Sequence, residues 1–291
     1  MILPDNLAHL IQTDCPLAER NWLGLGGPAQ YFAEPLSADE VQRLVTWAAD
    51  QDLRVRVLGG GSNLLVRSSG VDGLVLSLQS AETSAFHVEG NLLTVGTGAK
   101  LSQAVVKAVG SGLGGLEHLI GIPGTVGGAV VGNASAGGRD VGSAIQQVQV
   151  LRDNEIEWRD RQEFTFSHRK SSLGGETILA VRFELETAES APLTKRMQKL
   201  WINRQSTKPA DVTRIVMPFI DPDGISVGDL LRSVGLAGIR EGDASLDGKH
   251  PEYLLAGDAA TSDDCLRLID RVREQVTLQS GIDLQLNLRI W

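Results

Sequence analysis

The sequence lacks several features that would assign it to common protein classes. Its 291 residues include only two cysteines, Cys15 and Cys265. These are too few for a disulfide framework or a zinc site, and we predict no metal centre and a reducing, cytoplasmic location. No apolar run approaches the roughly 18 residues of a membrane span, so we expect no membrane insertion. The first residues show no basic segment followed by an apolar one, so we expect no secretory signal.

An excess of positive charge and a phosphate-binding lysine motif are also missing. The chain has 27 basic and 36 acidic residues, a formal net charge of −9. This balance argues against a general nucleic-acid binder. No Gly-Lys-Ser/Thr triplet occurs, so a P-loop nucleotidase has no support. The length allows one large domain or two to three small ones.

Glycine is the residue in excess. The chain has 33 glycines, about 11% where roughly 7% is average, and twenty of them lie between Gly59 and Gly142. No Gly-x-y period occurs, which excludes a collagen-like chain, and the Val, Leu and Ile residues of this window argue against a flexible linker. We predict a folded region in which the backbone turns tightly or approaches another group closely.

The order of apolar patterns predicts a mixed fold. Helices are expected at 37–48, where Ser37 and Glu40 read as a capping box, and at 101–109, 192–204 and 265–281. Strands are expected at 54–58, 64–66, 73–98, 148–186 and 282–290. The last segment alternates apolar and polar residues throughout, which predicts a half-buried strand. The sum is an α+β or mixed α/β fold in two or three subdomains.

Three glycine motifs compete for a functional interpretation. Gly110, Gly112 and Gly115 match Gly-x-Gly-x-x-Gly, but a predicted helix precedes them, so helix termination explains them better than a Rossmann turn. The Gly-Gly-Gly-Ser-Asn run at 59–63 could cradle a phosphate with its backbone N–H groups or form a tight hairpin turn. The glycines of 121–136 could leave a surface for a flat aromatic ligand or mark a bulged β region.

These motifs, in this order, carry a resemblance. Residues 58–65, 115–129 and 133–136 resemble the flavin-binding half of the UDP-N-acetylenolpyruvoylglucosamine reductase family, and 21–29 resembles its start. The resemblance covers nearly the whole chain. The absence of an inserted loop after Leu173 is similar to the short, type II form.

The resemblance implies a fold and an activity. The fold would be α+β, of the FAD-binding vanillyl-alcohol-oxidase (PCMH) type, with flavin subdomains at 1–80 and 81–190 and a smaller substrate subdomain at 191–291. NADPH would reduce bound FAD, and hydride would pass to the enolpyruvyl double bond of UDP-N-acetylglucosamine enolpyruvate. The product would be UDP-N-acetylmuramate, a precursor of peptidoglycan. We expect a cytoplasmic monomer whose partner is this UDP-sugar and not a nucleic acid.

The resemblance also implies site residues. Arg169 would stabilise the substrate carboxylate through charge-assisted hydrogen bonds. The FAD-binding residues would be Gly59, Gly60, Gly61, Ser62, Asn63, Leu64, Gly121, Ile122, Pro123, Gly124, Thr125, Gly127, Gly128, Asn133 and Ala134. The substrate-binding residues would be Ser171, Arg204, Lys208, Asp221 and His250.

Two family acid positions differ in this sequence. The proton donor, a serine or cysteine in the family, aligns with Met217, whose thioether cannot give a proton. The family's final-strand glutamate aligns with Asn287, whose amide is no acid at neutral pH. Three interpretations remain open: a reductase with another proton source such as water or Asp221, a flavin-binding protein without this activity, or a flavin oxidoreductase for another anionic substrate.

Overall fold

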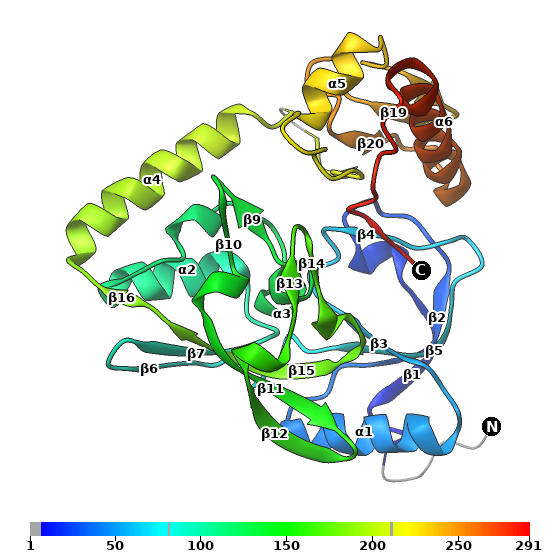
Figure 1. The fold of residues 1–291 in the computed structure, drawn as a ribbon. Coiled ribbons are helices and arrows are strands. Elements are labelled where there is room, and N and C mark those ends of the chain that lie inside the picture. Colours follow the sequence, from blue (N-terminus) through cyan, green and yellow to red (C-terminus); the bar gives the residue numbers. More distant parts are fainter. Residues whose placement is uncertain (1–6, 81, 210–211) are drawn as a thin grey trace. The chain divides into compact units, whose positions relative to one another are not determined.

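The computed structural model describes residues 7–80, 82–209 and 212–291 (Figure 1). Its larger sheets have four, five and four strands. The first sheet has the order β1 (Ile11–Pro16), β2 (Pro28–Ala33), β5 (Val71–Ser77), β3 (Val55–Leu58). The second is antiparallel, in the order β12 (Glu155–Asp160), β11 (Ile145–Arg152), β15 (Thr177–Glu184), β7 (Leu92–Gly96), β6 (Phe86–Glu89). The third has the order β17 (Ile215–Val216), β20 (Leu254–Ala256), β19 (Ala244–Leu246), β18 (Arg240–Glu241).

Helices and short strand pairs complete the described fold. The helices are α1 (Ala38–Asp50), α2 (Leu101–Gly110), α3 (Val126–Val131), α4 (Ser190–Ser206), α5 (Val227–Ser233) and α6 (Ser262–Ser280). The short pairs are β9 (Ser135–Ala136) with β10 (Arg139–Asp140), β13 (Phe166–Ser167) with β14 (Lys170–Ser171), β8 (Leu113–Gly114) with β16 (Glu186–Thr187), and β4 (Leu64–Leu65) with β21 (Arg289–Ile290). A 3₁₀ turn, η2, covers Glu117–Leu119.

The chain forms two compact units. Unit 1 contains the segment ending at Thr13, Tyr31–Gly60 and Asp72–Ser206. Unit 2 contains Asp14–Gln30, Gly61–Val71 and Thr207–Trp291. Along the sequence, the chain therefore passes from one unit to the other several times. One of these passages lies in the 59–63 glycine loop, after Gly60.

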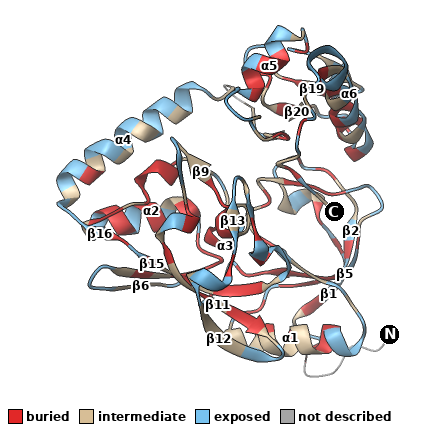
Figure 2. Cartoon of the chain, in the orientation of Figure 1, coloured by how far each residue is buried: buried red, intermediate tan, exposed pale blue. Residues whose placement is uncertain are grey.

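Unit 1 has two apolar cores. In the first, Val148 and Val181 of the five-stranded sheet pack with Val105 of α2 and Val130 of α3. In the second, apolar residues of α1 such as Leu44 pack with residues of β5, β11 and β15. Figure 2 shows these inner faces as buried, whereas α4 buries only Leu193. The mixed α+β architecture of the prediction is confirmed.

Unit 2 has one core, which α6 dominates. Leu268 and Val272 lie on its buried face and pack with Leu231 of α5 and Leu254 of β20. Thr261 and Asp264 form a capping box at its N-terminus, and Gly281 ends the helix with a φ of 74°. The predicted helix at 265–281 and its glycine stop are confirmed. None of the described helices has both the length and the apolar character of a membrane span.

Two local predictions are wrong in detail. The expected strand at 282–290 is regular only at β21, although Leu284 and Leu288 are buried as the alternation predicts. Residues 285–287 instead bond to the chain around Pro218, so neighbouring loops replace a long strand partner. At α1, the Ser37 hydroxyl accepts from the Glu40 N–H at 3.2 Å, but the Glu40 carboxylate accepts from the Leu36 N–H at 2.6 Å. The capping box is therefore incomplete.

Candidate active site

The glycine-rich segment before α3 is fastened to the turn that precedes α2. The Leu101 N–H donates to the Gly124 carbonyl and the Val126 N–H to the Ala99 carbonyl, at 3.0 and 2.9 Å. Buried Thr125 then caps α3, because its hydroxyl accepts from the Gly128 N–H at 3.3 Å. These bonds hold one predicted flavin-binding segment in a defined place within unit 1.

The first residues of the other glycine loop lie against this segment. A Cβ atom on Gly59 would lie 2.7 Å from the Thr125 hydroxyl, and one on Gly60 would lie 2.9 Å from the Gly124 Cα. Only glycine permits this approach of two backbones. Neither the Gly60 nor the Gly124 N–H donates to an acceptor in the described part of the chain. Two close, unused backbone donors fit the phosphates of a dinucleotide such as FAD.

The side chain of Asn133, which follows α3, is hydrogen-bonded to three other positions of the chain. It is 1% exposed and adopts a φ of 42°, a left-handed conformation that asparagine tolerates better than most residues. Its side-chain amide donates to the Ser167 carbonyl at 2.8 Å and to the Asp140 carboxylate at 3.1 Å. Its side-chain oxygen accepts from the Gly142 N–H at 3.1 Å. Asn133 thus serves here as a structural tie.

The hairpin β13–β14 carries Arg169 at its turn. Ser167 pairs with Lys170, so His168 and Arg169 form the two-residue tip. Two bonds tie this hairpin to the end of α3: the one from Asn133 to the Ser167 carbonyl, and the 2.9 Å bond from the Ser171 hydroxyl to the Val131 carbonyl. Arg169 has a φ of 57°, a strained conformation for a residue with a Cβ. The structure therefore brings together the 121–134 segment, Ser171 and the backbone of Arg169.

Arg204 of α4 contacts the backbone of the same glycine-rich region. Its guanidinium donates to the Ile120 carbonyl and, at 3.2 Å, to the His118 carbonyl. These contacts support the turn before Gly121, which has a φ of 77°. The role expected for Arg204 in substrate binding stays a prediction, as does that of Lys208.

His118 was not among the residues predicted for the site. It is 7% exposed, and neither of its ring nitrogens has a hydrogen-bond partner among the described residues. Burial, followed by the nearby charge of Arg139, lowers the pKa of His118 to about 4. The imidazole is therefore neutral near pH 7. A buried residue of this kind gives no periodic or motif signal.

Met217 and Asn287, the two positions at which the sequence predicts a departure from the family pattern, meet in unit 2. The Asn287 side chain donates to the Met217 carbonyl at 3.1 Å, and its backbone N–H donates to the Pro218 carbonyl at 2.8 Å. The Asn63 side chain donates to the Asn287 carbonyl at 2.7 Å, and the Arg289 N–H donates to the Asn63 carbonyl at 3.1 Å. The amide of Asn287 therefore ties the 217 loop to the chain end, a bond that an ionised carboxylate could not donate.

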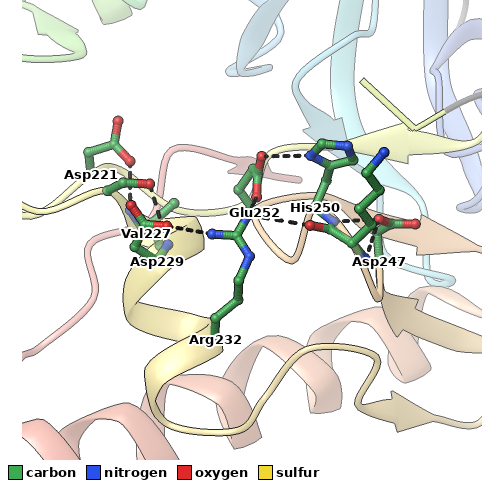
Figure 3. Close-up of polar contacts among 9 residues, drawn as sticks. Asp221, Val227, Asp229, Arg232, Asp247, His250 and Glu252 are labelled. Atoms are coloured by element: carbon green, nitrogen blue, oxygen red, sulfur yellow. Dashed lines mark hydrogen bonds and ion pairs between the residues drawn. The ribbon is translucent and has the colours of Figure 1, made fainter. Parts of the chain in front are cut away.

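The remaining predicted substrate residues lie around α5 (Figure 3). Asp221 is exposed, and its carboxylate accepts from the Val227 N–H at 2.9 Å, at the start of this helix. His250 lies in the β19–β20 loop with its Nδ1 3.7 Å from the Glu252 carboxylate. Arg232 of α5 reaches the same carboxylate at 3.9 Å. Arg232, Asp247 and Glu252 were not among the predicted residues. Asp247 and Glu252 lie within three positions of the Lys249–His250 pair, whereas no local signal marks Arg232.

Comparison with known proteins identifies both parts of the chain. Residues 29–155 match the FAD binding domain family, and 202–291 match the C-terminal domain of UDP-N-acetylenolpyruvoylglucosamine reductase. Proteins named UDP-N-acetylenolpyruvoylglucosamine reductase are 53% identical in Rhodopirellula baltica (99% of this chain, 95% of that protein) and 37% identical in Moorella thermoacetica (99% and 96%). The crystal structure of the reductase from Thermus caldophilus superposes with a TM-score of 0.84 at 31% identity, over 97% of this chain and 98% of that one. A solvent-stable cholesterol oxidase shares the FAD-binding fold at TM-score 0.50 and 17% identity, over 64% and 40%.

Proposed function

The chain belongs to the UDP-N-acetylenolpyruvoylglucosamine reductase family, and from this premise we propose that it reduces UDP-N-acetylglucosamine enolpyruvate to UDP-N-acetylmuramate, using FAD and NADPH. The likeness extends over nearly the full length of the relatives. The residues that would hold FAD also fit that role, because the loops at 59–60 and 124–125 approach each other through glycine backbone and leave N–H groups unused.

The proposed flavin site contains seven of the twenty glycines between Gly59 and Gly142. We propose that Gly59 to Leu64, Gly121 to Thr125, Gly127, Gly128, Asn133 and Ala134 hold the dinucleotide. When bound there and reduced by NADPH, FAD would supply the hydride for the enolpyruvyl double bond. The protein's own residues bind the substrate and orient it.

The position of Arg169 carries the proposal, because this residue has a strained backbone at the tip of a hairpin and both strands of the hairpin are bonded to the end of α3. The chain keeps a cation at the turn of a hairpin whose strands are bonded to the end of α3. A guanidinium there can donate two hydrogen bonds to a carboxylate and stabilise the charge that develops as hydride arrives. Backbone strain at a residue held so firmly is typical of a functional position.

The proton has a different origin from the one the family pattern implies. Met217 carries no acidic hydrogen, and the Asn287 amide is already bonded to the Met217 carbonyl. We propose that water donates the proton to the carbon next to the one that accepts hydride. General acid catalysis typically contributes about 10²–10⁴-fold, so turnover should be slow.

The test separates flavin reduction from substrate reduction. The purified chain, loaded with FAD, is reduced anaerobically with NADPH and then mixed with UDP-N-acetylglucosamine enolpyruvate. We expect the absorbance of oxidised flavin to return and UDP-N-acetylmuramate to form. Arg169→Ala should slow the return by about 10²-fold or more while NADPH still reduces the flavin.

Lys170→Ala is the matched control, because it removes the neighbouring cation of the same hairpin. In this variant the substrate should reoxidise the reduced flavin at close to the normal rate. If the reduced normal protein is not reoxidised by the substrate, the proposed activity is wrong. We also propose that the protein acts as a cytoplasmic monomer, which size-exclusion chromatography with light scattering can test for the assembly state.

A further inference from the structure

The carboxylate of Glu252 is an unusual group in unit 2. Its side chain is 19% exposed, and its Oε2 is buried without a hydrogen-bond partner in the described chain. Two cationic or ionisable groups stand at ion-pair distance instead: His250 Nδ1 at 3.7 Å from Oε1 and Arg232 Nη2 at 3.9 Å from Oε2 (Figure 3). A half-buried carboxylate held in this way costs desolvation free energy, so a purely structural reason is weak.

The glycine at position 228 leaves space for the Glu252 carboxylate. A Cβ atom on Gly228 of α5 would lie 2.5 Å from Glu252 Oε2, so any larger residue at position 228 would collide with it. Arg232, one turn further along α5, bonds to Asp229 at 2.5 Å and donates to the Lys249 carbonyl at 3.3 Å. The helix therefore contacts both the carboxylate and the loop that carries His250.

That loop is rigid. The Asp247 carboxylate accepts from the N–H groups of Lys249 and His250 at 3.0 and 2.6 Å. The Tyr253 N–H donates to the His250 carbonyl, and the Asp247 N–H to the Tyr253 carbonyl, both at 2.9 Å. The backbone of His250 is thus defined, and the rotation of its ring is the freedom that remains.

The Glu252 carboxylate limits this rotation of the His250 ring. The Glu252 carboxylate lies 3.7 Å from Nδ1, which is beyond hydrogen-bond length but close enough for electrostatic attraction to turn this side of the ring toward the carboxylate. Nε2 then lies on the other side of the ring and is the nitrogen left for a ligand. Together with the guanidinium of Arg232, 3.9 Å from the same carboxylate, it would suit an anionic ligand such as a diphosphate.

We propose that Glu252 is a positioning residue that orients His250 for the diphosphate of the UDP-sugar. The inference rests on the proposed function, which supplies the substrate. It adds a residue, Glu252, that acts on substrate affinity through His250 and does not take part in hydride transfer.

The experiment is a double-mutant cycle with two readouts, the steady-state KM and kcat for the UDP-sugar and the Kd for UDP by calorimetry. Glu252→Gln keeps the shape of the side chain and removes its charge. It should raise KM and the UDP Kd about three- to tenfold, with kcat changed less than about twofold. In a His250→Ala background the same substitution should change the UDP Kd by less than about twofold.

Asp229→Asn is the matched control, because it removes the exposed carboxylate partner of Arg232 and leaves Glu252 in place. It should leave KM and Kd unchanged.

A Glu252→Gln effect that persists in the His250→Ala background would show a structural role and overturn the inference, as would an unchanged Kd in Glu252→Gln. If the normal protein binds UDP but does not turn over the UDP-sugar, the proposed activity fails and the UDP cycle still decides the role of Glu252. Absence of UDP binding overturns the inference.

Discussion

The polar side chains of Asn287 and His118 differ in whether they have hydrogen-bond partners among the described residues. The Asn287 side chain donates to the Met217 carbonyl at 3.1 Å, and its backbone carbonyl accepts from the Asn63 side chain at 2.7 Å, so the residue ties the 217 loop to the chain end. The His118 imidazole is buried with both nitrogens unpaired among the described residues. The first arrangement stabilises the fold, whereas the second makes folding sensitive to pH.

Stability should fall as the pH is lowered through the range in which His118 titrates. The unfolded chain takes up a proton near pH 6.5, but the folded protein does so only near pH 4. Between these values the unfolded state binds more protons, so the free energy of unfolding decreases as the pH falls. The full effect is about 3 kcal/mol, and about 2 kcal/mol of it falls between pH 7 and pH 4.5, where urea titrations would measure it.

The matched variants are His118→Phe and His87→Ala. His118→Phe removes the titrating group and should flatten this part of the pH dependence, while the exposed His87 should have no effect. An equally steep pH dependence in His118→Phe would assign the loss of stability to other groups.

A hydroxyl at position 217 should speed the reaction, because the family's proton donor is expected at this position. Met217→Ser introduces a group that can pass a proton to the substrate and should raise the rate of flavin reoxidation by the UDP-sugar, by up to about 10²–10⁴-fold. Met217→Ala removes the thioether without adding a hydroxyl and should give no such gain. Equal rates for the two variants would place the proton source elsewhere.

At the scale of elements, α3 and its neighbours organise the candidate site. This short helix is capped by Thr125 and bonded through Val131 and Asn133 to the β13–β14 hairpin. The turn before it bonds to residues 99–101. The helix is too short to be stable alone, so these bonds and the buried Val130 hold it in place.

Gly60→Ala should disturb this arrangement. The added methyl group would lie 2.9 Å from the Gly124 Cα, which is backbone and cannot move freely. We expect a loss of about 1–3 kcal/mol in stability and at least about tenfold weaker FAD binding, followed by flavin fluorescence. Gly110→Ala is the control: nothing lies within 4 Å of its added Cβ, so FAD binding should not change. Normal affinity in Gly60→Ala would exclude a close backbone contact with the cofactor.

At the scale of the whole molecule, two compact units are built from interleaved chain segments. Unit 2 receives its first segments, Asp14–Gln30 and Gly61–Val71, from within the sequence of unit 1. The three-way division at residues 80 and 190 stays a prediction. The interleaving explains why no composition change marks a boundary: each unit draws its core from distant segments.

FAD should stabilise the protein as a whole. A ligand that binds only the folded state at 100 times its Kd adds about 2.7 kcal/mol to the free energy of unfolding. Thermal unfolding with and without FAD should show a higher Tm in its presence, and hydrogen exchange should slow in 59–64 and 121–134. Faster or unchanged exchange in these segments would contradict the proposed cofactor site.

The fold class and the family could be predicted from the sequence alone, because glycine positions, helix caps and apolar periods are local signals. The sequence also identified α6 from its apolar stripe and Gly281. Its prediction of one long final strand was wrong, because regular pairing depends on a partner strand that the local alternation cannot reveal.

Only the tertiary structure decided what the polar side chains contact. Asn287 meets Met217 across 70 positions, and Glu252 faces Arg232 of another element as well as nearby His250. Such contacts depend on how separate elements pack. They also depend on which polar groups become buried and so lose their hydrogen bonds to water. Those conditions are absent from any single stretch of sequence, and for that reason His118 and Glu252 became visible only in the folded chain.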